Sequence, residues 1–267
     1  MSDSSDKNKE TFGKTVGFVF IVCVVCAILV SFSAVQLKPL QVANKLLDQQ
    51  TKILEASNLL EASGKDPKSI VATFNKYVEA KMIDLASGEF IEGDPVLFDE
   101  RRNARDSEKS EKLENDPAGI SRQSNDAVVY LVRNDAGAVE TVVLPIVGSG
   151  LWDLMYGYVG LEADLNTIRS VVYSDHRETP GLGAEVMNPK WKALWPGKKI
   201  YNDSGEPVIK LVKGGAKAGD VHGVDALSGA TLTSNGVTRT LQFWFSKQGY
   251  GPFIEKYLAA NSNGGMK

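Results

Sequence analysis

The sequence predicts an α+β protein that begins with one membrane-spanning helix. Three observations predict this class. An uncharged apolar stretch runs from Thr15 to Leu37, and a segment of predicted helices and loops follows over 38–119. β-Branched runs then take over, include a hairpin signal and precede a final helix. This order predicts a domain with a mainly antiparallel sheet over 120–260, and a short tail over 261–267.

The stretch from Thr15 to Leu37 reads TVGFVFIVCVVCAILVSFSAVQL and is bracketed by Lys14 and Lys38. A spanning helix needs roughly 20 apolar residues, whereas the apolar core of a cleavable signal peptide has only about 7–15. We therefore predict a retained anchor rather than a signal peptide. Lysines flank both ends, so the positive-inside rule does not decide the orientation. A short tail (1–14) before a long domain favours a cytoplasmic N-terminus.

Composition argues against several function classes. The formal net charge of −3 is weakly acidic, whereas a nucleic-acid surface needs clustered Lys and Arg. Cys23 and Cys26 lie in the apolar run, away from polar groups that would stabilise a thiolate, so we predict no redox or zinc role for them. The two histidines, His176 and His222, are too few for a histidine-rich metal site. We predict no metal centre.

Two helices are predicted between the anchor and the sheet. Residues 41–62 are rich in helix formers, and residues 69–86 place apolar side chains four residues apart. Asp66 and Pro67 separate them. Residues 99–116 mix both charge signs, which indicates a solvated loop or helix rather than a binding patch. The apolar positions in the two helices are Leu46, Ile53, Leu54, Leu59 and Leu60, then Ile70, Phe74, Val78 and Met82.

Strand signals dominate the next part of the chain. Residues 127–133 and 139–147 are β-branched runs, and Asn134–Gly137 between them predicts a hairpin. Residues 167–174 and 207–213 predict further strands. A final helix is predicted to begin near Ser234, with one apolar face formed by Val237, Leu241, Trp244 and Phe245.

The stretch DALSGATLTS, residues 225–234, lies where a loop meets that final helix. Thr231, Thr233 and Ser234 therefore fall where the first backbone N–H groups of the helix lack partners. One hydroxyl could act as a helix cap, which stabilises by about 1 kcal/mol. The alternative is an anion site, because a helix N-terminus offers N–H donors and a positive dipole end. Gly229 would let the backbone approach a phosphate. The residues alone leave both interpretations open.

The segment Asp225–Thr231, DALSGAT, resembles the flavinylation motif of the FMN-binding domain family. HRETPGLGAEV (176–186) and GSGLWD (148–153) resemble two further signatures of that family. With the anchor and the 40–120 segment, the resemblance covers essentially the whole chain. It is similar to the C subunits of bacterial sodium-translocating NADH:quinone oxidoreductases. The related G subunits of Rnf-type complexes are shorter and remain an alternative, as does a membrane-anchored FMN-binding sensor.

The resemblance implies a covalent FMN, with its phosphate esterified to Thr231. A separate flavin transferase would attach it from FAD and read Asp225 as part of the motif. The rest of the motif is Ser228, Gly229, Ala230 and Thr233. The loop over the flavin would contain Glu178, Thr179, Leu182 and Gly183, with Leu182 offering an apolar face to the ring. His176 would have a structural role in that loop.

Two residues remain ambiguous at this level. Trp152 belongs either to the core or beside the flavin ring. Lys213 is either a solvated lysine or a cation that reaches the phosphate or the flavin N1–O2 region, where positive charge favours the reduced anion. No residue is assigned a catalytic role.

The resemblance also implies a function and a location. It implies an electron-carrier subunit that relays electrons from an iron–sulfur centre of membrane subunits to a second covalent FMN. Asp153 stands where a dinucleotide fingerprint needs its third glycine, so we expect NADH to be oxidised elsewhere in the complex. Because the transferase acts outside the cytoplasm, the large domain is expected on the periplasmic side of the bacterial inner membrane.

Overall fold

The computed structural model describes residues 12–64 and 66–262, and divides into two units between Asp48 and Gln49. The first unit is the greater part of helix α1, Phe12–Ala56. This helix is long and apolar enough to cross a membrane, by length and composition. The predicted anchor, 15–37, lies within it. The first eleven residues of the predicted N-terminal tail, and residues 263–267 of the C-terminal tail, lie outside the described residues.

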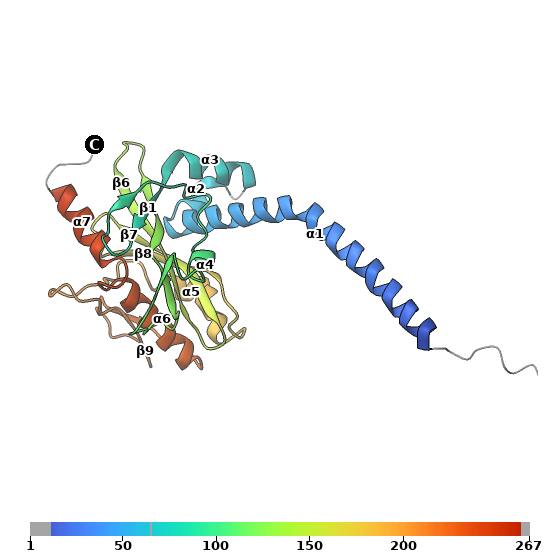
Figure 1. Cartoon of the computed structure of the whole chain (residues 1–267). Helices are drawn as coiled ribbons and strands as arrows, with labels where there is room; N and C mark the ends of the chain where they lie inside the picture. Colours follow the sequence, from blue (N-terminus) through green and yellow to red (C-terminus); the bar gives the residue numbers. More distant parts are fainter. Residues whose placement is uncertain (1–11, 65, 263–267) are drawn as a thin grey trace, which may run out of the picture. The chain divides into compact units, whose positions relative to one another are not determined.

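A six-stranded sheet forms the centre of the second unit (Figure 1). Its strand order is β2-β1-β5-β6-β7-β8, and every neighbouring pair is antiparallel. The predicted mainly antiparallel sheet is therefore confirmed. The strands are β1 (Val78–Asp84), β2 (Phe90–Ile91), β5 (Asp126–Arg133), β6 (Val139–Ser149), β7 (Leu154–Glu162) and β8 (Ile168–Asp175).

Apolar side chains cover both faces of this sheet. On β5, Val129 and Leu131 belong to the larger core cluster, whereas Val128 and Val132 belong to the smaller one. Successive strand residues point to opposite faces, so a strand that is buried on both faces reads as the unbroken apolar run seen in the sequence. The larger cluster includes side chains of α6 (Thr231–Trp244) and α7 (Gly251–Ser262).

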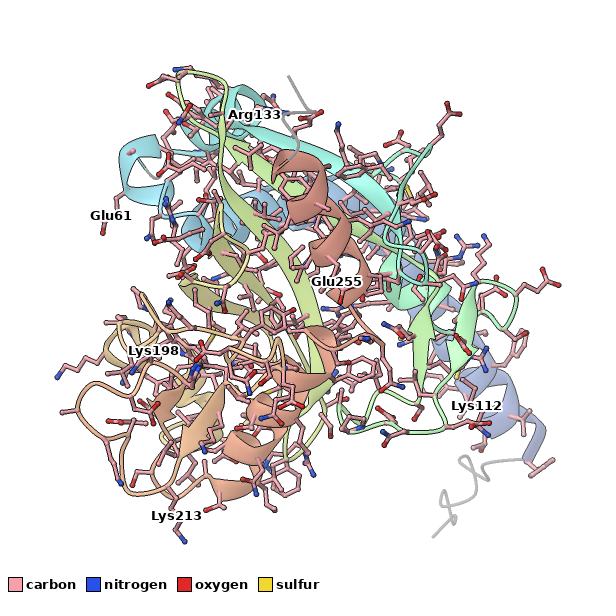
Figure 2. All side chains as sticks on the ribbon, turned by 90° about the vertical axis from the view of Figure 1, so that its left-hand side faces the viewer. Glu61, Lys112, Arg133, Lys198, Lys213 and Glu255 are labelled. Carbon is pink, nitrogen blue, oxygen red and sulfur yellow. The ribbon has the colours of Figure 1, made fainter. Side chains whose placement is uncertain are left out.

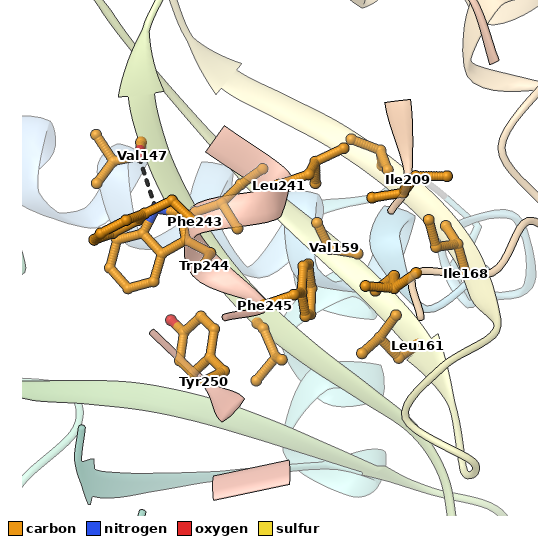
Figure 3. Close-up of a cluster of buried hydrophobic side chains, with 14 of the residues drawn as sticks. Val147, Val159, Leu161, Ile168, Ile209, Leu241, Phe243, Trp244, Phe245 and Tyr250 are labelled. Atoms are coloured by element: carbon orange, nitrogen blue, oxygen red, sulfur yellow. Dashed lines mark hydrogen bonds between the residues drawn. The ribbon is translucent and has the colours of Figure 1, made fainter. Parts of the chain in front are cut away.

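The aromatic end of α6 is fixed to the sheet by a polar bond inside the core (Figure 3). The Trp244 indole N–H donates to the Val147 carbonyl at 2.7 Å, so its one polar atom is satisfied where the ring is buried. Tyr250 makes the same kind of bond to the Pro145 carbonyl at 2.7 Å. Both partners lie on β6, the strand that leads into the 148–153 motif.

Shorter elements complete the unit. Two small sheets pair β3 (Ser110–Lys112) with β4 (Arg122–Ser124), and β9 (Lys210–Val212) with β10 (Gly223–Asp225). The second pair is parallel. The remaining helices are α2 (Leu60–Ser63), α3 (Pro67–Tyr77), α4 (Glu100–Asn103), the 3-10 helix η1 (Gly183–Met187) and α5 (Pro189–Lys192).

The predicted hairpin and the strand over 167–174 are confirmed as β5–β6 and β8. The predicted helix over 69–86 is wrong in its second half, because helix α3 ends at Tyr77 and Val78–Asp84 is strand β1. Val78, Ala80 and Met82 alternate along the strand. A spacing of four residues fits both a helix face and one face of a strand, and pairing along the whole of β5 selects the strand.

Other boundaries also differ from the predictions. Helix α1 continues only to Ala56, so the predicted helix over 41–62 is shorter at its end. Within the strand predicted over 207–213, only the three residues of β9 form a strand. The final helix begins at Thr231 rather than near Ser234, and α7 follows it. Strand β7 and helix α7 were not predicted from the sequence.

Candidate functional site

The turn before α6 is closed by two local hydrogen bonds. The Ala230 N–H donates to the Leu227 carbonyl at 3.2 Å, and the Leu227 N–H donates to the Ser234 hydroxyl at 3.0 Å. Gly229 holds φ at +70° in this turn, a conformation that favours glycine at the third turn position. The sequence Leu227-Ser228-Gly229-Ala230 therefore turns the chain sharply into the first residue of α6.

The helix N-terminus carries no side-chain cap. Its N-cap residue is Ala230, which has no hydroxyl to offer, and no side-chain cap hydrogen bond is made there. The capping interpretation of the hydroxyl residues is therefore wrong. Thr231 occupies the first helical position and is exposed. An exposed hydroxyl beside uncapped N–H groups at the positive end of a helix suits a bound phosphate.

The other two hydroxyls of the motif are turned inward. Thr233 is 1% exposed and donates its hydroxyl to Glu178 Oε2 at 2.5 Å. Ser234 is also buried, and its own N–H already bonds to the Ala230 carbonyl. The fold thus separates Thr231 from its hydroxyl neighbours by exposure. Ser228 lies exposed in the preceding turn.

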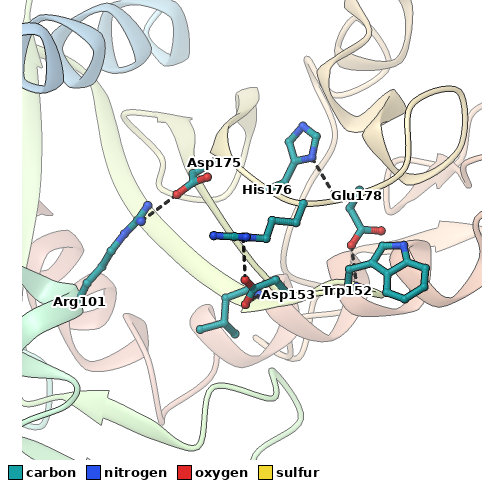
Figure 4. Close-up of polar contacts among 8 residues, drawn as sticks. Arg101, Trp152, Asp153, Asp175, His176 and Glu178 are labelled. Carbon is teal, nitrogen blue, oxygen red and sulfur yellow. Dashed lines mark hydrogen bonds and ion pairs between the residues drawn. The ribbon is translucent and has the colours of Figure 1, made fainter. Parts of the chain in front are cut away.

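Glu178 joins the three sequence motifs at one point. Its side chain is 5% exposed, and Oε1 accepts the backbone N–H groups of Leu151 (2.8 Å) and Trp152 (3.1 Å). With the Thr233 bond, one carboxylate links the 148–153 loop, the 176–186 loop and the first turn of α6. Figure 4 shows Glu178 directed toward Trp152, while its backbone N–H donates to His176 Nδ1 at 3.2 Å. His176 thus has a contact within its own loop.

Exposed apolar side chains surround this point. Trp152 is 67% exposed and Leu182 is 43% exposed, so neither belongs to the core. The Trp152 indole N–H donates to the Thr179 hydroxyl at 3.1 Å, which fixes its ring beside the 176–186 loop. A methyl carbon of Leu182 lies 3.0 Å from where a Cβ on Gly229 would stand, so the two loops are in close contact.

Asp225 and Lys213 lie at the neighbouring small sheet. Asp225 ends β10, and its Oδ1 accepts the Ala216 N–H at 2.8 Å, which holds the loop after β9 in place. Lys213 lies in that loop, is exposed, and points out from the domain surface (Figure 2).

The structure thus brings most of the predicted residues into contact and adds two that the sequence did not single out. Leu151 and Leu232 are exposed apolar residues beside Trp152 and Thr231. No spacing or residue type in the sequence distinguished these two leucines from their neighbours. Gly183 is buried, and a Cβ there would meet the side chains of Glu178 and Thr233.

These features fit FMN. An uncapped helix N-terminus offers donors to a phosphate, and a tryptophan and a leucine held at the surface offer apolar faces to a flat ring. Thr231 supplies an exposed hydroxyl where the phosphate would lie.

A model of the FMN-binding domain family matches residues 150–246, a span that contains most of these residues. The chain is 44% identical to the C subunit of the Na(+)-translocating NADH-quinone reductase of Yersinia pestis, over 96% of this chain and 97% of that protein. It is 47% identical to the C subunit of the Vibrio alginolyticus reductase, over 93% of this chain and 96% of that protein. The chain belongs to this family of C subunits.

The fold agrees with this family. The crystal structure of Shewanella oneidensis NqrC matches with a TM-score of 0.77 and 40% sequence identity, over 82% of this chain and 99% of that one. A C subunit is part of a larger reductase complex. The membership confirms the predicted resemblance and favours a C subunit over an Rnf-type G subunit or a free-standing sensor.

Proposed function

We propose that this chain is a covalent-FMN electron carrier within a sodium-translocating NADH:quinone reductase. In this proposal it takes electrons from an iron–sulfur centre of membrane subunits and delivers them to a second covalent FMN on another subunit. Bound FMN would supply the redox chemistry, since it exchanges single electrons. The observation that carries the proposal is the exposed Thr231 hydroxyl at an uncapped helix N-terminus, beside the apolar faces of Trp152 and Leu182.

Different residues would bind the phosphate and the ring of the flavin. Thr231 would hold the FMN phosphate, and the first N–H groups of α6 would stabilise its remaining charge. Trp152 and Leu182 would contact the ring, and Thr179 would keep Trp152 in place. Gly229 permits the close turn that presents Thr231. Covalent attachment removes dissociation, so a shallow site that partner subunits can approach is sufficient.

Attachment would require a partner. A threonine hydroxyl is a weak nucleophile without an adjacent base, and the neighbouring carboxylate, Glu178, is bonded to Thr233 rather than to Thr231. We therefore propose that a separate flavin transferase modifies Thr231 with FAD as donor, and that it reads Asp225. The exposure of Asp225, Ser228 and Thr231 supports access by another protein.

The proposal also includes a location. We propose a single pass of the bacterial inner membrane by residues 15–37, with residues 1–14 cytoplasmic and the domain from about 38 onward periplasmic. Helix α1, which is long and apolar enough to span a membrane, supports the single pass. The side is inferred from where the transferase would act.

A denaturing gel viewed under ultraviolet light tests the attachment. The chain should be produced with a flavin transferase, boiled in detergent and separated. A covalent flavin stays in the protein band and fluoresces, whereas a dissociable flavin runs with the dye front. A band without fluorescence, from protein that is folded and was exposed to active transferase, would contradict the proposal.

A further inference from the structure

A single buried carboxylate organises the whole site. Glu178 Oε1 accepts two backbone N–H groups, from Leu151 and Trp152, and Oε2 accepts the Thr233 hydroxyl. An ionised carboxylate is an acceptor only, and three donors match that capacity. Because hydrogen bonds to charged groups are stronger than neutral ones, these three bonds are firm links between separate segments.

The surroundings of this carboxylate are shaped to fit it. A Cβ on Gly150 would stand 2.4 Å from Oε1, and a Cβ on Gly183 would stand 2.3 Å from Oε2. Both distances are too short for any side chain. Glycine at these two positions therefore lets two loops close around the buried carboxylate of Glu178.

A second link joins the same two loops but is of a different kind. Arg177 and Asp153 form an ion pair at 3.1 Å, and both side chains are largely exposed. Exposed ion pairs contribute little, because solvent screens them and the side chains lose freedom. The buried Glu178 therefore contributes more to holding the 148–153 and 176–186 loops together than the exposed Arg177–Asp153 ion pair does.

The bonds that Glu178 accepts determine the positions of the residues proposed to contact the flavin. The bond to the Trp152 N–H fixes the backbone that carries the indole, and Thr179, the next residue after Glu178, receives the indole N–H. The bond to Thr233 fixes the first turn of α6, two residues from Thr231. Glu178 thus links the backbone of Trp152 to the helix turn that carries Thr231, while Thr179 orients the indole.

We propose that Glu178 is the positioning residue for the flavin: its carboxylate sets the ring-contacting Trp152 against the attachment residue Thr231. This rests on the proposed function, since it presumes a flavin at Thr231. Glu178 does not touch the reacting atoms. It acts through Trp152 and Thr233.

The test uses the full-length chain in detergent, prepared with and without flavin transferase. In the flavin-free form, hydrogen exchange reports directly on the Leu151 and Trp152 amides. Glu178→Ala should remove their protection while the amides paired between β6 and β7 stay protected. Glu178→Gln should retain most of the protection, because its amide oxygen accepts both N–H groups and its NH₂ can donate to Thr233.

In the flavin-loaded form, flavin fluorescence reports on the ring contact, because a stacked tryptophan quenches a flavin. We expect Glu178→Ala to brighten the covalent flavin and Glu178→Gln to restore quenching. Arg177→Ala is the matched control, since it cuts only the exposed pair and should change neither signal. Thr233→Val removes only the hydrogen bond between Glu178 and α6. It should therefore brighten the flavin while the Leu151 and Trp152 amides stay protected. The same variant tests the proposal if Glu178→Ala fails to fold.

Wild-type amide protection and flavin quenching in Glu178→Ala would overturn the positioning role. So would unchanged quenching in Thr233→Val, if Glu178→Ala cannot be prepared. Failure of the proposed function has a different outcome: wild-type protein would then lack covalent flavin after treatment with active transferase, while the amide measurement on the flavin-free chain could still be made.

Discussion

At the residue scale, Thr231 and Thr233 show how burial gives different roles to neighbours of one type. Both are threonines in the first turn of α6, and the local sequence leaves their hydroxyls almost equivalent. In the fold Thr231 is exposed, whereas Thr233 is buried and bonded to Glu178. Only the first hydroxyl is accessible to a modifying enzyme.

This difference gives the first prediction. Thr231→Val keeps the side-chain shape and removes the hydroxyl, so it should abolish covalent flavin completely. Intact-protein mass spectrometry measures the flavin adduct after exposure to transferase. The control is Ser204→Ala, an exposed hydroxyl outside the motif, which should still be modified at Thr231. An adduct that persists on Thr231→Val, or maps to Thr233, would refute the assignment.

Asp225 gives a second prediction at this scale. Its carboxylate is exposed and also holds the Ala216 N–H, so Asp225→Ala alters both charge and loop geometry. Asp225→Asn keeps an oxygen acceptor for Ala216 and removes only the charge. If the transferase reads the charge, both variants should incorporate flavin more slowly when transferase is limiting. Incorporation by both at the wild-type rate would reject this role, and slowing in Asp225→Ala alone would assign it to the loop.

At the element scale, α6 packs tightly against the end of β6. The Ser149 carbonyl oxygen would lie 2.2 Å from a Cβ on Gly236, so the helix touches the strand through bare backbone at this point. This contact lies directly before the 148–153 loop. The position of that loop therefore depends on the close approach of helix and strand.

Gly236→Ala tests this packing. Alanine favours a helix interior by about 1 kcal/mol over glycine, yet overpacking typically costs about 1–3 kcal/mol. Because the obstacle is a backbone atom, we expect the overpacking to dominate and the free energy of unfolding to fall by about 1–2 kcal/mol. Urea denaturation measures it. Asn235→Ala, on the exposed side of α6, is the control; a Gly236→Ala protein as stable as wild type would contradict the close contact.

Glu100 in helix α4 makes the stability of the fold depend on pH. Glu100 is half-buried, and its loss of hydration raises its pKa from 4.5 to about 7, although the neighbouring Arg101 acts in the opposite direction. Between these values the folded state binds the proton more tightly than the unfolded state. The stability that Glu100 contributes is therefore fully present below pH 4.5 and is lost as pH rises through about 7.

Glu100→Gln should remove this dependence. A glutamine stays neutral, so the variant should gain stability relative to wild type as pH rises from about 4.5 to about 7, by up to roughly 1 kcal/mol per pH unit. Urea denaturation of both proteins at several pH values in this range gives the difference. If the free energies of unfolding of the two proteins change with pH in parallel, Glu100 has the same pKa in the folded and unfolded states.

At the scale of the whole molecule, the testable property is topology. We expect residues from about 38 onward on the periplasmic side and residues 1–14 in the cytoplasm. Protease added to intact spheroplasts should then digest the large domain and leave the anchor protected in the membrane. In inverted vesicles the domain should be protected. Digestion in inverted vesicles alone would show the opposite orientation.

The sequence by itself determined much of this protein. The uncharged stretch of Thr15–Leu37, the hairpin at Asn134–Gly137 and the apolar face of α6 are local patterns, set by composition and spacing along one segment. The three motifs are also local, so the family resemblance and the choice of Thr231 could be made without coordinates.

The tertiary structure decided what depends on partners distant in the chain. Residues 78–84 became a strand because β5 pairs with them, although their spacing fitted a helix as well. Trp152 stands at the surface because Thr179 and Glu178 hold it there. Thr233 is buried and bonded to a carboxylate more than fifty positions away, whereas Thr231 is exposed. Such contacts leave no periodic trace in the sequence, because each is a single bond between segments whose meeting is set by the packing of the whole core.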